Sequence, residues 1–520
     1  MEYVIVLSVI AGALGLYYFL FKDLNRFKKH NIPHLKPLPL VGNMGPTFLR
    51  MKSTAELVKE MYDVNTEAKY SGGYDVGTPL IILRDPELIK NIALKHFDSF
   101  PDHRSFVREE QEPLFGKNLF SLCGDRWREV RSTLSPAFTS SKMKNMFKLM
   151  SDYAADFAKF IAELPTERRV MDTKDVFTRY TNDVIATCAF GVSVDSMRDP
   201  KNLFYVYGKE ATTFTTITLI KMYVHRSLPW VARIFRLRII SEKIAIFFKD
   251  LVETTIKTRD EQGITRPDML QLMMESRSKK GGKKELTIED MTSQAFSFFF
   301  GGFDSTSTLM CFAAHEIAVN EEVRKRLQDE IDQVLEETNG QAPYEAINQM
   351  EYLDAVVNEA LRKYPVAVAV DRLCVKDFEL PPTLPGTKPY VVKSGEILWL
   401  PIYGLQHDTK HFEEPEKFNP DRFLGERKKE TLNTGAFLPF GLGPRMCIGN
   451  RFALMETKVL LFHLLARCDL LPCEKTPIPI MLARDGFTMK PEGGFWLKVV
   501  PRNNPHRTVL VNVANGTRDL

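Results

Sequence analysis

The residues with the clearest chemical potential form one short run, FGLGPRMCIG, from Phe440 to Gly449. Cys447 in this run comes just before an apolar helical stretch, RFALMETKVLLFHLL. Backbone N–H groups and the positive end of a helix dipole favour the thiolate of a cysteine at a helix start, and the thiolate is the form that binds metal ions. The run therefore predicts a cysteine–metal site at the beginning of a helix.

Other motifs for nucleotide or metal binding are incomplete in this sequence. Gly441 and Gly443 lack the third glycine of a dinucleotide-binding loop, and none of the Gly-Lys pairs has the spacing of a phosphate-binding loop. Val319 stands where a zinc-protease helix that starts at His315 needs its second histidine. The chain has no Cys-x-x-Cys pair, so tetrahedral zinc is disfavoured.

A second candidate site lies inside a long predicted helix. Thr287 and Asp290 form a capping-box pattern, and the apolar pattern continues to about Val319, which predicts a helix of roughly 50 Å. Its middle, Gly301–Ser307 (GGFDSTS), holds two glycines that cost about 1 kcal/mol each and three hydroxyls that compete for carbonyls. One interpretation of the two glycines is a kink or a close helix crossing. The other is bare backbone against which a flat cofactor lies, with Asp304 and a neighbouring hydroxyl positioned to deliver protons.

The cysteine run matches the F-x-x-G-x-R-x-C-x-G loop of the cytochrome P-450 family, the haem-thiolate monooxygenases. Four further motifs precede it in the family's order: WREVR at 127–131, the helix with GG-x-DST, EALR at 359–362 and FNPDRF at 418–423. An E-x-x-R motif alone carries little weight because i,i+3 salt bridges are common on helices. Together, the five motifs show that the chain resembles this family over essentially its whole length. Within the family it resembles the microsomal, xenobiotic-metabolising branch, including insect members.

The resemblance implies a haem b cofactor. Cys447 would be the axial thiolate ligand of the iron, donating electron density that favours O–O cleavage. The two haem propionates bring about two negative charges and require charge-assisted donors. By the family pattern, the remaining haem contacts would be Trp127, Arg131, Arg372, Arg445 and either His103 or Arg104, with Phe440 beside the sulfur and Gly449 allowing close approach.

The resemblance also makes Asp304 and the next hydroxyl the acid and alcohol pair that delivers protons. Ser305 stands where the family generally has threonine, and Thr306 follows it. Serine lacks the methyl group that restricts the rotamer, so we expect a looser relay and more uncoupling to peroxide. The family's buried ion network behind the cysteine loop would consist of Glu359, Arg362 and Arg422.

The segments that bind substrate in the family are aromatic and uncharged here. They contain Phe106, Phe115, Phe120, Phe296, Phe300, Phe303, Val366–Val370 and Phe487. Such a lining favours neutral, lipophilic and fairly large substrates. Phe214–Tyr223 is either a lid that dips toward a bilayer or the face of a core helix.

Electrons must come from a partner, because the chain has no flavin or nicotinamide fingerprint. The resemblance implies NADPH acting through the membrane-bound cytochrome reductase, with cytochrome b5 as a further candidate. A basic docking face and an ordinary solvated surface are equally compatible with Arg126, Arg128, Lys142 and Lys144.

The N-terminus predicts a membrane anchor. Tyr3–Phe21 is a run of 19 residues without charge, just long enough to span a bilayer, and four basic residues follow by Lys29. We favour an uncleaved transmembrane signal anchor over a buried core helix, and place the rest of the chain on the cytosolic face of the endoplasmic reticulum. The expected organisation is an anchor (1–21), a basic, proline-rich spacer (22–45), a single haem domain (46–500) and a C-terminal tail (501–520).

Composition fits this organisation. The 520 residues are 44% apolar and 26% charged, typical of a globular protein, and a net charge of +4 gives no reason to expect nucleic-acid binding. Seven scattered cysteines argue for a reducing compartment. Helical patterns dominate residues 126–365, while strand-like segments lie near the start (Thr78–Leu83) and after 366, including Phe495–Val500. We predict a mainly α fold with small β-sheets (α+β).

Three functions remain open from sequence. The first is a reductase-dependent monooxygenase. The second is a haem-thiolate isomerase or dehydratase of peroxides, which Asp304 and its neighbouring hydroxyl disfavour. The third is a haem-containing binding protein without turnover.

Overall fold

The computed structural model describes residues 12, 15, 24–39, 41–105, 107, 109–266, 268–277, 286–485 and 488–502. The predicted anchor, apart from Gly12 and Gly15, lies outside the described residues, as do Phe106, Phe487 and the tail from residue 503. Within the described part of the chain, no helix combines the length and apolar character needed to cross a membrane.

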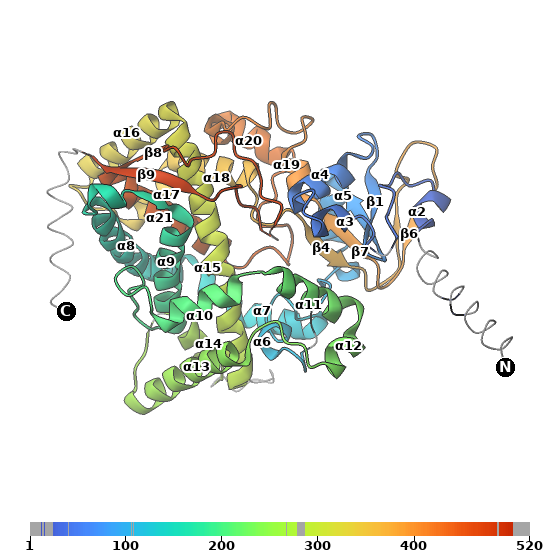
Figure 1. The fold of residues 1–520 in the computed structure, drawn as a ribbon, viewed down its shortest axis with the longest axis horizontal. Helices are drawn as coiled ribbons and strands as arrows, with labels where there is room; N and C mark the ends of the chain where they lie inside the picture. Colours follow the sequence, from blue (N-terminus) through green and yellow to red (C-terminus); the bar gives the residue numbers. More distant parts are fainter. Residues whose placement is uncertain are drawn as a thin grey trace.

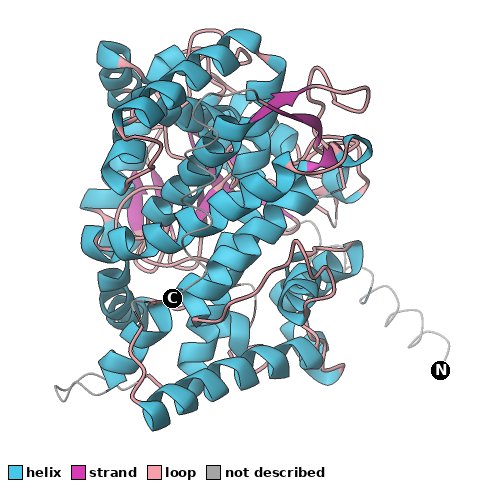
Figure 2. Cartoon of the chain, turned by 90° about the vertical axis from the view of Figure 1, so that its left-hand side faces the viewer, coloured by secondary structure: helices cyan, strands magenta, loops and turns pink. Residues whose placement is uncertain are grey.

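Helices make up most of the structure, and the strands gather in a few places (Figure 2). The α-helices are α2 (Arg26–Lys29), α3 (Gly45–Phe48), α4 (Thr54–Asp63), α5 (Pro86–Lys90), α6 (Pro113–Gly116), α7 (Gly124–Leu134), α8 (Ser140–Ala162), α9 (Thr173–Ile185), α10 (Leu203–Thr212), α11 (Thr216–Ser227), α12 (Pro229–Ile234), α13 (Glu242–Gln262), α14 (Met269–Arg277), α15 (Ile288–Val319), α16 (Glu321–Glu337), α17 (Tyr344–Gln349), α18 (Glu351–Lys363), α19 (Ile402–Gln406), α20 (Gly425–Asn433) and α21 (Asn450–Arg467). The short 3-10 and π helices are η1 (Asn91–Lys95), η2 (Phe97–Ser99), η3 (Ser135–Phe138), η4 (Thr166–Arg168), η5 (Ala186–Phe190) and η6 (Pro420–Phe423).

The strands form three small sheets. They are β1 (Tyr70–Asp75), β2 (Thr78–Leu83), β3 (Val170–Asp172), β4 (Val370–Leu373), β5 (Phe378–Leu380), β6 (Tyr390–Val392), β7 (Ile397–Leu400), β8 (Cys468–Leu471) and β9 (Trp496–Pro501). The largest sheet has the order β1-β2-β7-β4, in which only the β2–β7 pair is parallel. The others are β3-β9-β8 and β5-β6, so β3 adds a strand that the sequence did not predict.

Local sequence signals account for several element boundaries. The predicted strand Thr78–Leu83 is β2, and the Asp85 side chain accepts a hydrogen bond from the Glu87 N–H at 2.9 Å, capping α5. The capping box at the start of α15 is present, and the helix ends at Val319 as predicted. The mainly α prediction with small sheets is confirmed.

Two apolar cores meet at the cysteine run. A helical core packs around α8, α9, α15 and α21, and a sheet core packs β1, β2 and β7 against α4 and α5. Figure 1 shows the sheet core on the right and α15 crossing the helical part of the molecule. Trp399 and Phe437 contact both cores, while Phe440 packs on the helical core and Leu442 on the sheet core. The loop that precedes α21 is therefore fixed from two sides.

Part of the predicted spacer packs onto the sheet core. Phe27 in α2 is fully buried there, and Ile32 is nearly so. Gly42 pairs with Asp75 at the end of β1. The described residues between 24 and 45 are thus integrated into the fold, because their apolar side chains find partners on the first sheet.

Candidate active site

The run from Phe440 to Gly449, which we call the cysteine loop, is closed by backbone geometry. The Cys447 N–H donates to the Phe440 carbonyl oxygen at 2.9 Å, and Gly449 is the N-cap of α21. Gly443 has a φ of +79°, and a Cβ there would lie 2.2 Å from the Ala93 carbonyl oxygen. Only glycine fits this position, because both the φ angle and the close approach exclude a side chain.

The Cys447 residue is accessible to solvent, although its sulfur lies deep among protein atoms. Burial raises the pKa of the Cys447 thiol, while the Gly449 N–H and the Arg131 guanidinium oppose this rise. The Gly449 N–H at the start of the helix therefore acts in favour of the thiolate, and a bound metal ion would deprotonate the thiol on coordination.

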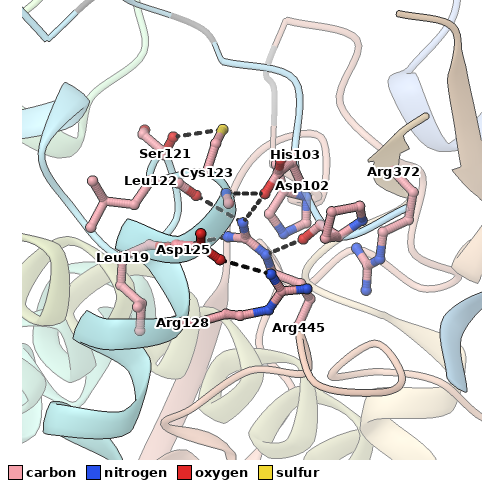
Figure 3. Close-up of polar contacts among 12 residues, drawn as sticks. Asp102, His103, Leu119, Ser121, Leu122, Cys123, Asp125, Arg128, Arg372 and Arg445 are labelled. Atoms are coloured by element: carbon pink, nitrogen blue, oxygen red, sulfur yellow. Dashed lines mark hydrogen bonds and ion pairs between the residues drawn. The ribbon is translucent and has the colours of Figure 1, made fainter. Parts of the chain in front are cut away.

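Arg445 interacts with other residues of the same chain (Figure 3). One Nη2 N–H donates to the Asp102 carboxylate at 2.8 Å, and its guanidinium carbon lies 4.0 Å from the centre of the Trp127 ring. Its other hydrogen bonds go to the carbonyl oxygens of Pro101, Leu119 and Leu122. Four of its five N–H groups are thus occupied, so Arg445 anchors the loop to the segment before α7, and its predicted contact with a propionate stays a prediction.

Arg372 and Arg131 are different, because neither forms an ion pair with a carboxylate among the described residues. Arg372, in β4, is 1% exposed and donates only to the carbonyl oxygens of Asp371 and Leu442. Its buried Nε has no hydrogen-bond partner in the described part of the chain. Burial lowers the pKa of Arg372 to about 10; the Asp371 carboxylate opposes this shift, and the nearby Arg445 adds to it. Arg131, in α7, donates to the Met446 carbonyl oxygen at 2.9 Å and lies near Cys447.

His103 is held beside these arginines. Its Nδ1 lies 2.9 Å from the Asp371 carboxylate, and its ring stacks on Phe120 at 4.5 Å. Burial lowers the pKa of His103, although Asp371 opposes this. The Arg104 N–H donates to the same carboxylate at 2.6 Å, so Asp371 organises both residues that the sequence left as alternatives.

The two glycines in the middle of α15 serve different purposes. A Cβ added at Gly302 would lie 3.1 Å from the Ile185 side chain of α9, whereas one added at Gly301 would meet nothing within 4 Å. Gly302 therefore allows a close helix crossing, and Gly301 leaves exposed backbone on α15. The crossing agrees with one of the two interpretations that the sequence left open, and the position of a cofactor beside Gly301 stays a prediction.

The predicted relay residues point to different neighbours. The Ser305 hydroxyl donates to the Gly301 carbonyl oxygen, while the Asp304 carboxylate lies 2.9 Å from the Lys174 ammonium of α9. Thr306 is buried, 2% exposed. Ser305 is therefore the accessible hydroxyl of the pair. Lys174 could not be found from sequence, because its spacing from Asp304 matches no local pattern.

The predicted substrate residues divide into two groups. Phe296 and Phe303 have essentially no accessible surface and belong to the helical core, and their predicted role in lining a substrate site stays a prediction. Phe115 and Phe300 remain partly accessible, with ring centres 5.4 Å apart. Phe120 is exposed beside His103, and Val370, at the start of β4, packs on the edge of the sheet core.

A buried ion pair links α18 to the cysteine loop. Arg362 and Glu359 are both 0% exposed and share two hydrogen bonds, of 2.8 and 3.0 Å, while Arg422 Nε lies 3.5 Å from Glu359. Arg362 also donates to the Gln406 carbonyl oxygen, and the Gln406 side chain accepts from the Leu438 N–H at 3.1 Å. The network thus ends two residues before the loop begins.

Comparison with known proteins identifies the family. A sequence profile described as Cytochrome P450 matches residues 32–497. Cytochrome P450 9e2 of Blattella germanica is 46% identical over 506 residues, covering 92% of this chain and 94% of the relative. Probable cytochrome P450 9f2 of Drosophila melanogaster is 41% identical over 514 residues, covering 96% and 99%, and Cytochrome P450 6j1 of Blattella germanica is 34% identical over 508 residues, covering 96% and 99%.

The chain belongs to the cytochrome P450 family. It is an oxidoreductase, a haem-thiolate monooxygenase whose haem iron takes a cysteine thiolate, and the relatives named above come from insects.

The residues present fit a haem. Cys447 is accessible at the start of α21, and the backbone beside Gly301 is open. The guanidinium groups of Arg131 and Arg372, which lack carboxylate partners among the described residues, match the two propionates in number and sign.

We predict that Glu359→Ala causes haem loss. Removing the carboxylate leaves the fully buried Arg362 without its anion, at a cost of about 3 to 5 kcal/mol, and releases the support behind the loop. The measurement is the haem-to-protein ratio of the purified variant. Glu426→Ala is the matched control, because Glu426 and Lys429 form an exposed i,i+3 pair. Full haem retention in Glu359→Ala would contradict the assigned role.

Proposed function

We propose that this monooxygenase inserts one oxygen atom into neutral, lipophilic small molecules, xenobiotics among them, with electrons from NADPH through a membrane-bound reductase. The observation that carries the proposal is that the accessible Cys447 lies in the loop just before α21, and that α21 contacts α15, the helix with the accessible Gly301. Haem b, when bound, supplies the activation of dioxygen.

The residues around these two helices then have defined tasks. Cys447 holds the iron, and Arg131 and Arg372 compensate the propionates. Ser305 holds a proton at its hydroxyl, on the same side of α15 as the Gly301 backbone, and Asp304 exchanges protons with solvent.

Aromatic side chains support the substrate class. Phe115 and Phe300 keep accessible surface near the open part of α15, and Phe214 packs on Phe300 with ring centres 5.8 Å apart. Such surfaces bind apolar molecules and orient them through few polar groups. The substrate contacts that we propose are Phe115 and Phe300 on the helical core, together with Val370 at the edge of the sheet core.

Exposed apolar side chains support attachment to the endoplasmic reticulum membrane, with the catalytic part on the cytosolic side. Ile217 and Ile220 of α11 and Trp230 of α12 are 55 to 66% exposed, and Phe48, at the end of α3, contacts Tyr223 of α11. Exposed apolar clusters of this kind mark membrane or protein contacts. The predicted anchor at residues 1–21 would act together with this surface.

The reductase is needed because the haem has to receive electrons from a partner protein. Cytochrome b5 is a second candidate donor. The basic residues predicted for docking give limited support. Arg126 pairs with Glu129 and Asp290, Arg128 with Asp98 and Asp125, and Lys144 with Glu345. A partner that docks at this face has to compete with these acidic side chains for the basic groups. Lys142 is the remaining residue of the predicted docking surface.

Reconstitution tests the proposal. The purified protein, combined with NADPH-cytochrome reductase in phospholipid vesicles, should show the red-shifted ferrous carbon monoxide spectrum of a thiolate ligand. It should also oxidise a neutral alkoxy-aromatic probe in an NADPH-dependent reaction. Hydroperoxide rearrangement without reductase would instead favour the peroxide isomerase, and a thiolate spectrum without any product would favour a binding protein.

Ser305→Thr should lower the amount of peroxide released per NADPH consumed. The added methyl group restricts the side-chain rotamer and holds the hydroxyl more firmly on the Gly301 carbonyl oxygen. Peroxide and NADPH are measured together in the reconstituted system. An unchanged ratio would rule out the loose relay.

A further inference from the structure

We propose that Gln294 of α15 is a positioning residue for the substrate. Its side-chain amide holds residues 114–122, which we call the wall segment, against α15. It thereby fixes the substrate contact Phe115 relative to the exposed backbone of Gly301. The inference rests on the proposed function and names a residue that determines how a lipophilic substrate is oriented.

The Gln294 side chain makes two hydrogen bonds to the backbone of the wall segment. Its Oε1 accepts from the Leu119 N–H at 2.9 Å, and its Nε2 donates to the Lys117 carbonyl oxygen at 2.7 Å. One donor and one acceptor on the backbone match the two ends of a single amide group. Gln294 is 1% exposed, so replacing it with an apolar side chain would leave the Leu119 N–H without this partner in a buried setting.

Ser293 adds a third hydrogen bond from α15, because its hydroxyl donates to the Leu114 carbonyl oxygen at 2.9 Å. Helical spacing relates these side chains to the accessible part of α15. Ser293 and Phe300 are seven residues apart, as are Gln294 and Gly301, so each pair lies on one side of the helix, about 10 Å apart along its axis. The hydrogen bonds to the wall segment are therefore made on the sides of α15 that carry Phe300 and Gly301.

The cysteine loop holds the wall segment from another direction (Figure 3). Arg445 donates to the carbonyl oxygens of Leu119 and Leu122, at 3.4 and 2.8 Å. Within the segment, the Asn118 side chain accepts from the Ser121 N–H at 2.9 Å. The peptide groups of Leu119 thus bond to α15 through the N–H and to the cysteine loop through the carbonyl oxygen, so the wall segment links the two parts of the proposed site.

Phe115 depends on these bonds for its position. It lies between Leu114 and Lys117, the first two positions that α15 binds. Its ring meets those of Phe296 and Phe300 nearly at right angles, with centres 5.6 and 5.4 Å away. Apolar contacts of this kind are weakly directional and would let the segment shift along α15, whereas hydrogen bonds require defined directions. The hydrogen bonds therefore determine where the accessible part of Phe115 stands.

Amide hydrogen exchange of the holoenzyme tests whether Gln294 holds the segment. Gln294→Met removes both hydrogen bonds at similar side-chain size. Gln328→Met is the matched control, because Gln328 is also buried but donates to Asp469 from α16. Exchange in the peptide covering residues 114–122 should become about fivefold faster in Gln294→Met, the effect of one lost hydrogen bond, and stay at the wild-type rate in Gln328→Met. Unchanged exchange in Gln294→Met would overturn the inference.

The product distribution in the reconstituted system tests the effect on the substrate. The probe is n-butylbenzene, a neutral molecule with benzylic, internal and terminal carbons. Gln294→Met should change the ratio of benzylic to terminal alcohol by about threefold or more, because small displacements of a bound substrate alter which carbon reacts. Ser293→Ala should shift the ratio in the same direction by less, and Gln328→Met should keep the wild-type ratio.

A product ratio does not depend on the amount of folded or haem-loaded protein, so a general loss of stability cannot produce this shift. An unchanged ratio in Gln294→Met, with faster exchange in the wall segment, would overturn the orienting role. Wild-type protein that makes no NADPH-linked product would refute the proposed function instead, and hydrogen exchange would still decide whether Gln294 holds the wall segment.

Discussion

A buried guanidinium group needs a compensating anion, and this requirement governs the region around the cysteine loop. Arg362 meets it with Glu359, and Arg445 meets it with Asp102. Arg372 is equally buried, but its hydrogen bonds go only to carbonyl oxygens, and its Nε has no partner among the described residues. We propose that a haem propionate is the anion that compensates Arg372 when the cofactor is bound.

The same requirement explains how distant segments are held together. Glu359 and Arg362 on α18 support the loop through Gln406, Arg445 ties it to the segment before α7, and apolar contacts from both cores fix its backbone. On α15, Lys174 of α9 again brings a cation to a carboxylate, that of Asp304, but this pair is partly exposed. The buried ion pairs Glu359–Arg362 and Asp102–Arg445 thus support the cysteine loop, whereas the partly exposed pair Lys174–Asp304 lies at the proposed proton relay.

Local sequence patterns predicted the features that depend on interactions between neighbouring residues, such as helix starts and caps. The capping box fixed the start of α15, Asp85 and Pro86 fixed α5, and the position of Cys447 before α21 followed from the apolar run after it. Motif resemblance supplied the network of Glu359, Arg362 and Arg422, in which the structure brings both arginines within 3.5 Å of Glu359.

Other features depend on packing between distant segments and leave no local signal. Asp102, Asp371 and Lys174 stand in ordinary polar sequence, and their partners lie 130 to 343 positions away. Phe296 and Phe303 show the converse problem. Their aromatic character suits a substrate site, but helix packing against α9, α10 and α13 turns both into the helical core. Spacing along one helix could not reveal which face its neighbours would cover.

The central claim is that the haem propionates complete Arg131 and Arg372. The most direct test is to titrate the haem-free protein with iron protoporphyrin IX and with its dimethyl ester, following the quenching of tryptophan fluorescence. Because hydrogen bonds to charged groups contribute about 1.5 to 3 kcal/mol each, the account predicts that the ester binds at least about 100-fold more weakly. Equal affinities for the two porphyrins would contradict it.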